Sequence, residues 1–144
     1  MMDKNYKEAL KLDNQLCFPL YASARKIMNA YTPYLKPYNL TYTQYLVFLV
    51  LFEEKKISVK ELGERLYLDS GTLTPMLKNM EKEGYVVRSR SKKDERITIV
   101  NLSQKGEDMY ENLKNIPFKV GEALNLKVDD TIELRRLLNI YLGK

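Results

Sequence analysis

The chain has 144 residues, of which 44% are hydrophobic and 30% are charged, as is ordinary for one soluble globular domain. Its net charge is +5, which is compatible with a polyanionic partner but does not require one. The sequence holds no histidine and a single cysteine, so the usual zinc sites, Cys–His proteases and histidine-based acid–base enzymes are excluded. We therefore expect a protein that is not an enzyme and that needs no metal and no cofactor.

The sequence also bears on location. No apolar run reaches the ~20 residues that a membrane helix requires. The first residues, MMDKNYKEALKLDN, lack the apolar core of a secretion signal. We expect a cytoplasmic protein without a membrane partner.

The first strong pattern is a helical spacing of apolar residues over about 15–36. Pro19 has no amide hydrogen and its ring crowds the carbonyl four residues back. The regular helix therefore either starts just before Pro19 or bends in its first turns. Both alternatives place Cys17 near a helix N-terminus, and Pro33 and Pro37 mark the way out of this helix.

The centre of the chain predicts a buried helix followed by two short helices in succession. An almost wholly apolar helix over about 43–54 comes first and should be buried on most sides, and Ile57 adds a short strand. A capping box that starts at Ser58 opens the next helix. A further helix runs from Ser70 to about Glu83, where Gly84 supplies a left-handed stop. Two such helices joined by a few residues form a helix-turn-helix.

Two strands follow directly, over 85–90 and 97–102, and the charged segment SKKDER joins them. A β-hairpin placed after a helix-turn-helix is the sequence form of a wing. Ser103 then caps a long helix that is bent or broken near Pro117, and a capping box over Asp130–Glu133 opens the last helix.

These elements predict a mainly α fold with a small β-wing, a winged helix-turn-helix flanked by helices at both ends. The DNA-binding lobe covers about 40–102 and the flanking helices about 14–38 and 104–144, within one domain over 1–144. The terminal helices have too little domain of their own to bury their Leu, Tyr and Ile side chains. A two-fold homodimer is the natural solution.

The N-terminal part of the second helix of a helix-turn-helix enters the major groove of DNA. The outward residues there are short and polar: Ser70, Thr72, Thr74, Lys78 and Asn79. The wing carries the basic residues Arg88, Arg90, Lys92, Lys93 and Arg96 beside Asp94 and Glu95. Alone, either group would suit an ordinary solvated surface, but their succession favours double-stranded DNA as the partner.

The same residues carry a family resemblance. The segments are LDNQLCFPLYASAR, LTYTQYLVFLVL, LGERLYLDSGTLTPMLKNMEKEGYVVR and SKKDERITIVNLSQKG. With them the chain resembles the MarR (multiple-antibiotic-resistance regulator) family, and within it the single-cysteine organic-hydroperoxide sensors of the OhrR type. The resemblance implies a homodimer with a helical base and two winged lobes, bound to a palindromic operator. It also implies that Asp94 steadies Arg96 at the wing tip and that Ser70 and Thr72 face the DNA.

Cys17 is the candidate redox residue. A lone cysteine is usually an inert small apolar group, but the positive end of a helix favours the thiolate, the form that attacks a peroxide. Tyr21, Tyr31 and Tyr42 could donate hydrogen bonds to that thiolate. The resemblance implies that Tyr31 and Tyr42 hold the reduced cysteine from the partner subunit. The alternative interpretation is that these tyrosines only pack at a helix interface.

The sequence thus favours a redox-sensing repressor that leaves its operator when an organic hydroperoxide oxidises Cys17. The resulting sulfenic acid has no resolving cysteine in its own chain, so it condenses with a small thiol or a backbone nitrogen, or oxidises further. Three alternatives stay open. They are a MarR-type regulator that answers a small phenolic ligand with Cys17 incidental, a thiol peroxidase, and a winged helix used only for protein contacts.

Overall fold

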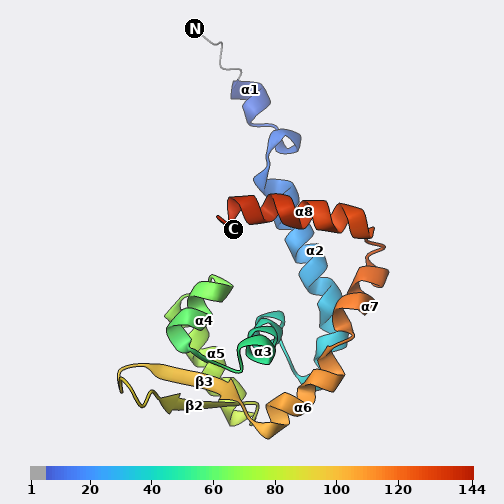
Figure 1. Cartoon of the computed structure of the whole chain (residues 1–144). Helices are drawn as coiled ribbons and strands as arrows, with labels where there is room; N and C mark the ends of the chain where they lie inside the picture. Colours follow the sequence, from blue (N-terminus) through green and yellow to red (C-terminus); the bar gives the residue numbers. More distant parts are fainter. Residues whose placement is uncertain (1–5) are drawn as a thin grey trace. The chain divides into compact units, whose positions relative to one another are not determined.

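The computed structural model describes residues 6–144 (Figure 1). They form two compact units. The lobe unit comprises residues 33–116, and the helical unit comprises residues 6–32 with residues 117–144. Most of the described chain is helical and its sheet is small, so the predicted fold class, mainly α with a β-wing, is confirmed.

The lobe unit contains the predicted helix-turn-helix and wing. Its elements are α3 (Tyr42–Glu54), β1 (Lys56–Ser58), α4 (Val59–Leu66), α5 (Ser70–Lys82), β2 (Val86–Arg90), β3 (Thr98–Leu102) and α6 (Gln104–Leu113). The strands form an antiparallel sheet in the order β1-β3-β2. Val100 in the central strand faces Ile57 on one side and Arg88 on the other. The hairpin of β2 and β3 projects from the side of this unit (Figure 1).

Side-chain caps set where these helices begin. Thr41 and Gln44 form a capping box at α3 that the sequence analysis did not identify. The predicted box at Ser58 is present: its Oγ accepts a hydrogen bond from the amide of Glu61 at 3.1 Å, and its own amide donates to Glu61 at 3.2 Å. Asp69 caps α5 by accepting from the amide of Thr72 at 2.8 Å. Each such cap contributes ~1 kcal/mol to the stability of its helix.

The core of the lobe unit is built on α3, whose apolar run is buried as predicted. The ring of Phe48 meets the ring of Tyr85 edge-on, with 5.4 Å between the centroids. The inner faces of α4, α5 and the sheet cover it with Leu62, Leu73, Leu77, Met80, Val86 and Val100, all almost fully buried. Burial of each large side chain contributes ~1.5–3 kcal/mol, which holds the helix-turn-helix against α3.

The helical unit contains α1 (Tyr6–Ala9), most of α2 (Cys17–Leu35), α7 (Ile116–Ala123) except its first residue, and α8 (Val128–Tyr141). Short 3-10 turns cover Leu12–Asn14 and, beyond α2, Lys36–Tyr38. Within residues 6–144 no helix is both long enough and apolar enough to cross a bilayer.

The prolines act largely as the sequence indicates. Helix α2 starts at Cys17, two residues before Pro19, where a missing amide hydrogen costs nothing because the first amides of a helix lack partners. Pro33 lies in the last turn of α2, and Pro37 in the 3-10 turn after it. The predicted break near Pro117 is also present, since α6 ends at Leu113 and α7 begins at Ile116.

The predicted capping box over Asp130–Glu133 is wrong. Helix α8 begins at Val128, and its N-cap, Lys127, makes no side-chain cap. Glu133 instead accepts two hydrogen bonds from Arg136, each of 2.8 Å. The earlier start places Asp130 in the first turn of the helix, where the positive end of the helix stabilises a carboxylate.

Candidate DNA interface and redox site

The turn of the helix-turn-helix is packed too closely for a larger residue at one position. A Cβ added to Gly63 in α4 would stand 2.8 Å from the carbonyl oxygen of Leu68. Tyr67 adopts the left-handed conformation, with φ of 55°, and the amide of Leu68 donates to the carbonyl of Gly63 at 2.9 Å. This close turn sets the direction of α5 relative to α4.

Helix α5 presents the predicted DNA-facing residues as a polar surface. Ser70, Thr72, Lys78 and Asn79 are exposed, and Thr74 is half-buried. Leu73, Leu77 and Met80 occupy the opposite, buried face. The structure therefore brings the five predicted residues together along the outer side of one helix.

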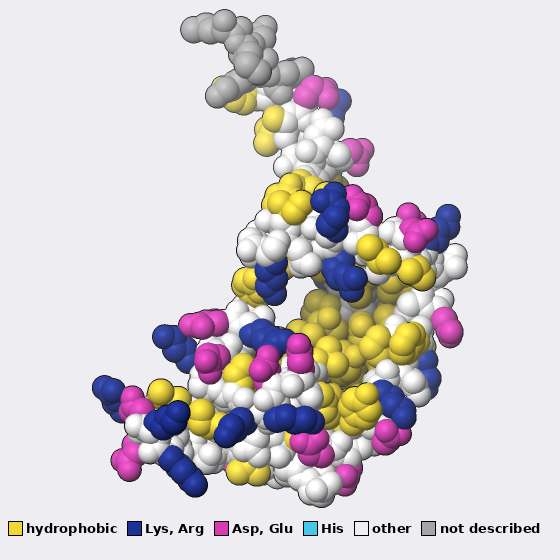
Figure 2. Space-filling view, viewed as in Figure 1, with side chains coloured by type: hydrophobic (Ala, Val, Ile, Leu, Met, Phe, Trp, Pro, Cys, Tyr) yellow, Lys and Arg dark blue, Asp and Glu magenta, His cyan; other side chains and the backbone are white. Residues whose placement is uncertain are grey.

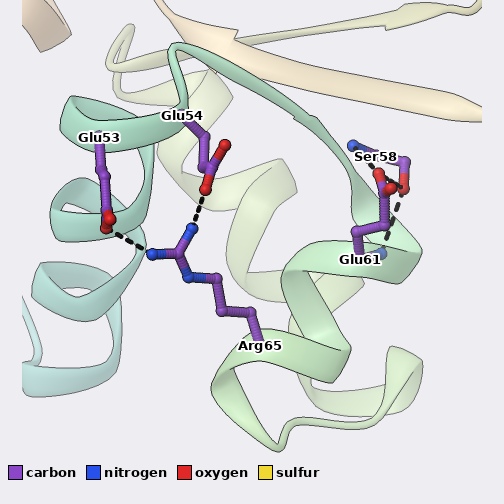
Figure 3. A network of polar contacts seen from close by, with 5 residues as sticks. All are labelled: Glu53, Glu54, Ser58, Glu61 and Arg65. Carbon is purple, nitrogen blue, oxygen red and sulfur yellow. Dashed lines mark hydrogen bonds and ion pairs between the residues drawn. The ribbon is translucent and has the colours of Figure 1, made fainter.

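A network of polar contacts attaches α4 to α3 (Figure 3). Arg65, in the last turn of α4, donates hydrogen bonds to Glu53 and Glu54 at the end of α3. Two carboxylates at a helix C-terminus are unfavourable by themselves, because the last carbonyls carry partial negative charge. Arg65 offsets that cost and fixes the first helix of the helix-turn-helix on α3. The sequence pattern alone does not indicate this network, because its residues belong to two different helices.

The wing tip is organised by Asp94. Its carboxylate accepts hydrogen bonds from the backbone amide of Arg96 at 3.0 Å, from its Nε at 3.0 Å and from its terminal guanidinium nitrogen at 2.9 Å. These bonds lower the pKa of Asp94 and raise the pKa of Arg96. The Arg96 side chain is nevertheless 90% exposed, so its charge faces solvent in one fixed direction. The pairing that the family resemblance implies is present.

The remaining basic residues of the wing differ from one another. Lys92, Lys93 and Arg90 are exposed, and Lys and Arg side chains gather at the end of the hairpin (Figure 2). Arg88 does not belong to this exposed group. Its side chain is only 24% exposed, and it donates to Glu81 of α5 at 2.9 and 3.1 Å.

Cys17 is exposed and is the first residue of α2. The predicted position near a helix N-terminus is therefore confirmed. Tyr21 follows one turn later, and its hydroxyl accepts a hydrogen bond of 3.2 Å from Arg25. Tyr31 lies fourteen residues after Cys17 in the same helix, which corresponds to roughly 21 Å along the axis. Tyr31 therefore cannot reach the cysteine of its own α2.

Tyr42, the other tyrosine that the resemblance implicates, is the first residue of α3 in the lobe unit. Burial raises its pKa, because a phenolate loses more from desolvation than a neutral phenol does. Its hydroxyl therefore keeps its proton at neutral pH and is able to donate a hydrogen bond.

The lobe unit also contains a cleft of about 790 Å³ between α4, the turn and β3. Apolar side chains, among them Val59, Leu68 and Ile97, form much of its lining. Arg96 lies at its edge on the wing side. A cleft of this size can hold a small organic molecule.

Comparison with known proteins assigns the family. The model of the transcriptional regulator SarA/Rot family matches residues 29–113. The regulator SarZ of Staphylococcus saprophyticus is 46% identical over 133 residues, 92% of this chain and 91% of that protein. The organic hydroperoxide resistance transcriptional regulator of Bacillus subtilis is 46% identical over 134 residues, 93% of this chain and 89% of that protein.

Among solved structures, that of reduced AbfR bound to DNA aligns with a TM-score of 0.79 at 36% identity and covers 96% of both chains. This chain belongs to the SarA/Rot family of MarR-like winged-helix transcriptional regulators.

Proposed function

We propose that the protein is a redox-sensing, DNA-binding transcription repressor that leaves its operator when an organic hydroperoxide oxidises Cys17. The observation that carries this proposal is an exposed cysteine at the first position of α2. It stands in a chain that is 46% identical, over 134 aligned residues, to an organic hydroperoxide resistance transcriptional regulator. We place this activity in the cytoplasm.

The DNA-binding part of the proposal rests on α5 and the wing. Ser70, Thr72 and Thr74 lie near the start of α5, the end that enters the major groove in helix-turn-helix proteins. Lys78 and Asn79 extend this surface toward the backbone of the duplex. At the wing, Asp94 directs Arg96 toward the minor groove, where the negative potential is strongest. Two exposed lysines and an arginine of the wing contact phosphates, namely Lys92, Lys93 and Arg90.

The homodimer is supported by the apolar surface of the helical unit. Several large apolar side chains of α2 and α8 are exposed in the single chain: Phe18, Leu20, Met28, Ile132, Leu134, Leu137 and Ile140. A second copy of the chain covers them in the proposed dimer. Two-fold symmetry then presents two recognition helices to a palindromic operator, about one turn of DNA apart.

The same dimer brings tyrosines to Cys17. Because Tyr31 cannot reach the cysteine of its own helix, a contact between them requires a second chain. In the proposal, Tyr31 and Tyr42 of one subunit donate hydrogen bonds to the Cys17 thiolate of the other. Tyr21 lies one turn from Cys17 on the same helix face and shields it from the side.

The oxidation proceeds in two steps. The thiolate sulfur of Cys17 attacks the terminal oxygen of the hydroperoxide and forms an S–O bond while the O–O bond breaks. The alkoxide leaves and takes up a proton from solvent to become the alcohol, so the hydroperoxide is reduced by two electrons. The cysteine is thereby oxidised by two electrons to a sulfenic acid. A small cellular thiol then attacks the sulfenic sulfur, water leaves, and a mixed disulfide forms. The bulk of this adduct separates the tyrosines from Cys17 and changes the spacing of the two recognition helices.

A mobility-shift assay on the DNA upstream of the protein's own gene tests the proposal. An organic hydroperoxide, supplied with a small thiol, should release the wild-type protein but not Cys17→Ser. Serine is nearly isosteric with cysteine but forms no sulfenic acid, so this variant should fold and bind normally. Mass spectrometry should find one thiol adduct per oxidised chain. Release of Cys17→Ser by the peroxide would overturn the sensor mechanism.

The cleft beside α4 favours a second candidate, a regulator that responds to a small phenolic ligand with Cys17 incidental. An aromatic acid in this cleft would place its carboxylate near Arg96 and so compete with the wing's contact to DNA. Reversible release by an aromatic acid, equal in the wild type and in Cys17→Ser, would support this candidate.

A further inference from the structure

Glu81, in the last turn of α5, and Arg88, in the middle of β2, are joined by three hydrogen bonds. One oxygen of Glu81 accepts from the backbone amide of Arg88 at 2.9 Å. The other accepts from the Nε of Arg88 at 3.1 Å and from a terminal nitrogen at 2.9 Å. One carboxylate therefore engages both the backbone and the guanidinium of the strand, which makes this pair stronger than an ordinary surface ion pair.

The pair spans the connection between the recognition helix and the wing. Helix α5 ends at Lys82, and β2 begins at Val86. Between them Gly84 reverses the chain with φ of +82°, a backbone conformation that favours glycine. The backbone of the turn is held by hydrogen bonds from the amide of Tyr85 to the carbonyl of Met80 and from the amide of Gly84 to the carbonyl of Glu81, each of 2.9 Å. The Glu81–Arg88 pair adds a contact between the side chains of the helix and of the strand beyond the turn.

We propose that Glu81 and Arg88 are positioning residues for operator binding, which hold the wing at one fixed angle to α5. This inference rests on the proposed function. With the angle fixed, α5 in the major groove and Arg96 in the minor groove engage the duplex together. Arg88 then acts through Glu81 and does not contact phosphate, unlike Arg90 of the same strand. The pKa of Glu81 is lowered, chiefly by the backbone hydrogen bond from Arg88, so its carboxylate stays charged at neutral pH.

Positioning and direct contact predict opposite results for two substitutions. Glu81→Gln removes a negative charge near DNA, so electrostatics alone would leave binding unchanged or strengthen it. Loss of the positioning contact weakens binding instead. Arg88→Lys keeps the charge, and a lysine replaces an arginine well at a phosphate. It lacks the planar fork that bonds Glu81 through two nitrogens, so the positioning role predicts a loss here too.

The experiment measures the Kd for the upstream DNA at several salt concentrations, together with hydroxyl-radical footprints, for the wild type, Glu81→Gln, Arg88→Lys and Arg90→Gln. Glu81→Gln and Arg88→Lys should bind roughly tenfold more weakly, and their salt slopes should fall because the wing loses its contacts to phosphates. Their footprints should lose protection under the wing but keep it under α5. Arg90→Gln, the matched control, should lower the salt slope by about one.

Two outcomes overturn the inference. Wild-type affinity in Glu81→Gln or in Arg88→Lys would show that the pair does not position the wing. Weaker binding with wild-type protection under the wing in both variants would show that the loss does not come from a change in the position of the wing. If the wild-type protein itself shows no salt-dependent DNA binding, the proposed function fails. That failure is seen in the wild type, whereas failure of the positioning role is seen only in the variants.

Discussion

Gly106, in the first turn of α6, lies against the backbone that joins α5 to the wing. A Cβ added there would stand 2.1 Å from the carbonyl oxygen of Tyr85 and 3.0 Å from the Cδ2 of Leu102. The Tyr85 carbonyl also accepts hydrogen bonds from the amide and the hydroxyl of Ser103, at 3.0 and 3.2 Å. In Gly106→Ala the start of α6 must therefore move away from Tyr85 by roughly 1 Å.

Three contributions determine the stability of this variant. Overpacking costs ~1–3 kcal/mol, and weakening of the hydrogen bonds from Ser103 costs ~1 kcal/mol each. The better helix propensity of alanine returns ~1 kcal/mol. The free energy of unfolding of Gly106→Ala should therefore fall by about 2–4 kcal/mol, a large part of the ~5–15 kcal/mol typical of a folded protein.

Urea unfolding at equal protomer concentration measures this change. Gly121 in α7 provides the matched control, because a Cβ added there meets no atom within 4 Å. Gly121→Ala should gain ~0.5–1 kcal/mol from helix propensity alone. Equal stability of Gly106→Ala and Gly121→Ala would show that the backbone of α6 at Gly106 leaves room for a Cβ beside the carbonyl of Tyr85, contrary to this reasoning.

Three further outcomes follow from the lobe unit. Arg65→Gln loses its bonds to Glu53 and Glu54 and should lower the free energy of unfolding by only about 1 kcal/mol, since the pairs are largely exposed; an unchanged urea midpoint would contradict it. Arg96→Ala should weaken operator binding and leave the urea midpoint unchanged, because its side chain is 90% exposed; wild-type affinity would refute its assignment to the minor groove. The pKa of Glu61 is lowered, mainly by its side-chain hydrogen bond with Ser58, so its contribution to stability is present above the ordinary value near 4.5 and is lost as the pH falls through the lowered pKa. Unfolding measured from pH 6 to pH 3 should thus depend less on pH in Glu61→Gln than in the wild type, and equal dependence would count against it.

The two capping boxes show what local sequence can and cannot predict. Ser58 with Glu61 and Asp130 with Glu133 have the same spacing, yet only the first is present. Ser58 also pairs with Ile99 as the last residue of β1, so the sheet keeps its backbone extended at the point where a helix must start. Before α8 no strand imposes such a constraint, and the helix begins at Val128. Tertiary structure, not the motif, decides between the two.

Pairs between different elements of the lobe unit, such as Glu81–Arg88, could not be predicted from the sequence for a similar reason. Glu81 lies on α5 and Arg88 on β2, so no single helical or strand repeat relates them. They meet because Gly84 reverses the chain between the two elements. The charge pattern of the sequence groups Arg88 with the other basic residues of the wing as a candidate for DNA contact. Such a pattern indicates where a charge lies but not which side chain binds it. Arg90 lies one strand repeat further along and bonds the hydroxyl of Thr98, so its charge is not neutralised there. A basic residue in a wing is therefore a candidate for DNA contact where its side chain stays exposed, as that of Arg96 does at 90% beside Asp94, whereas the side chain of Arg88 is 24% exposed against Glu81.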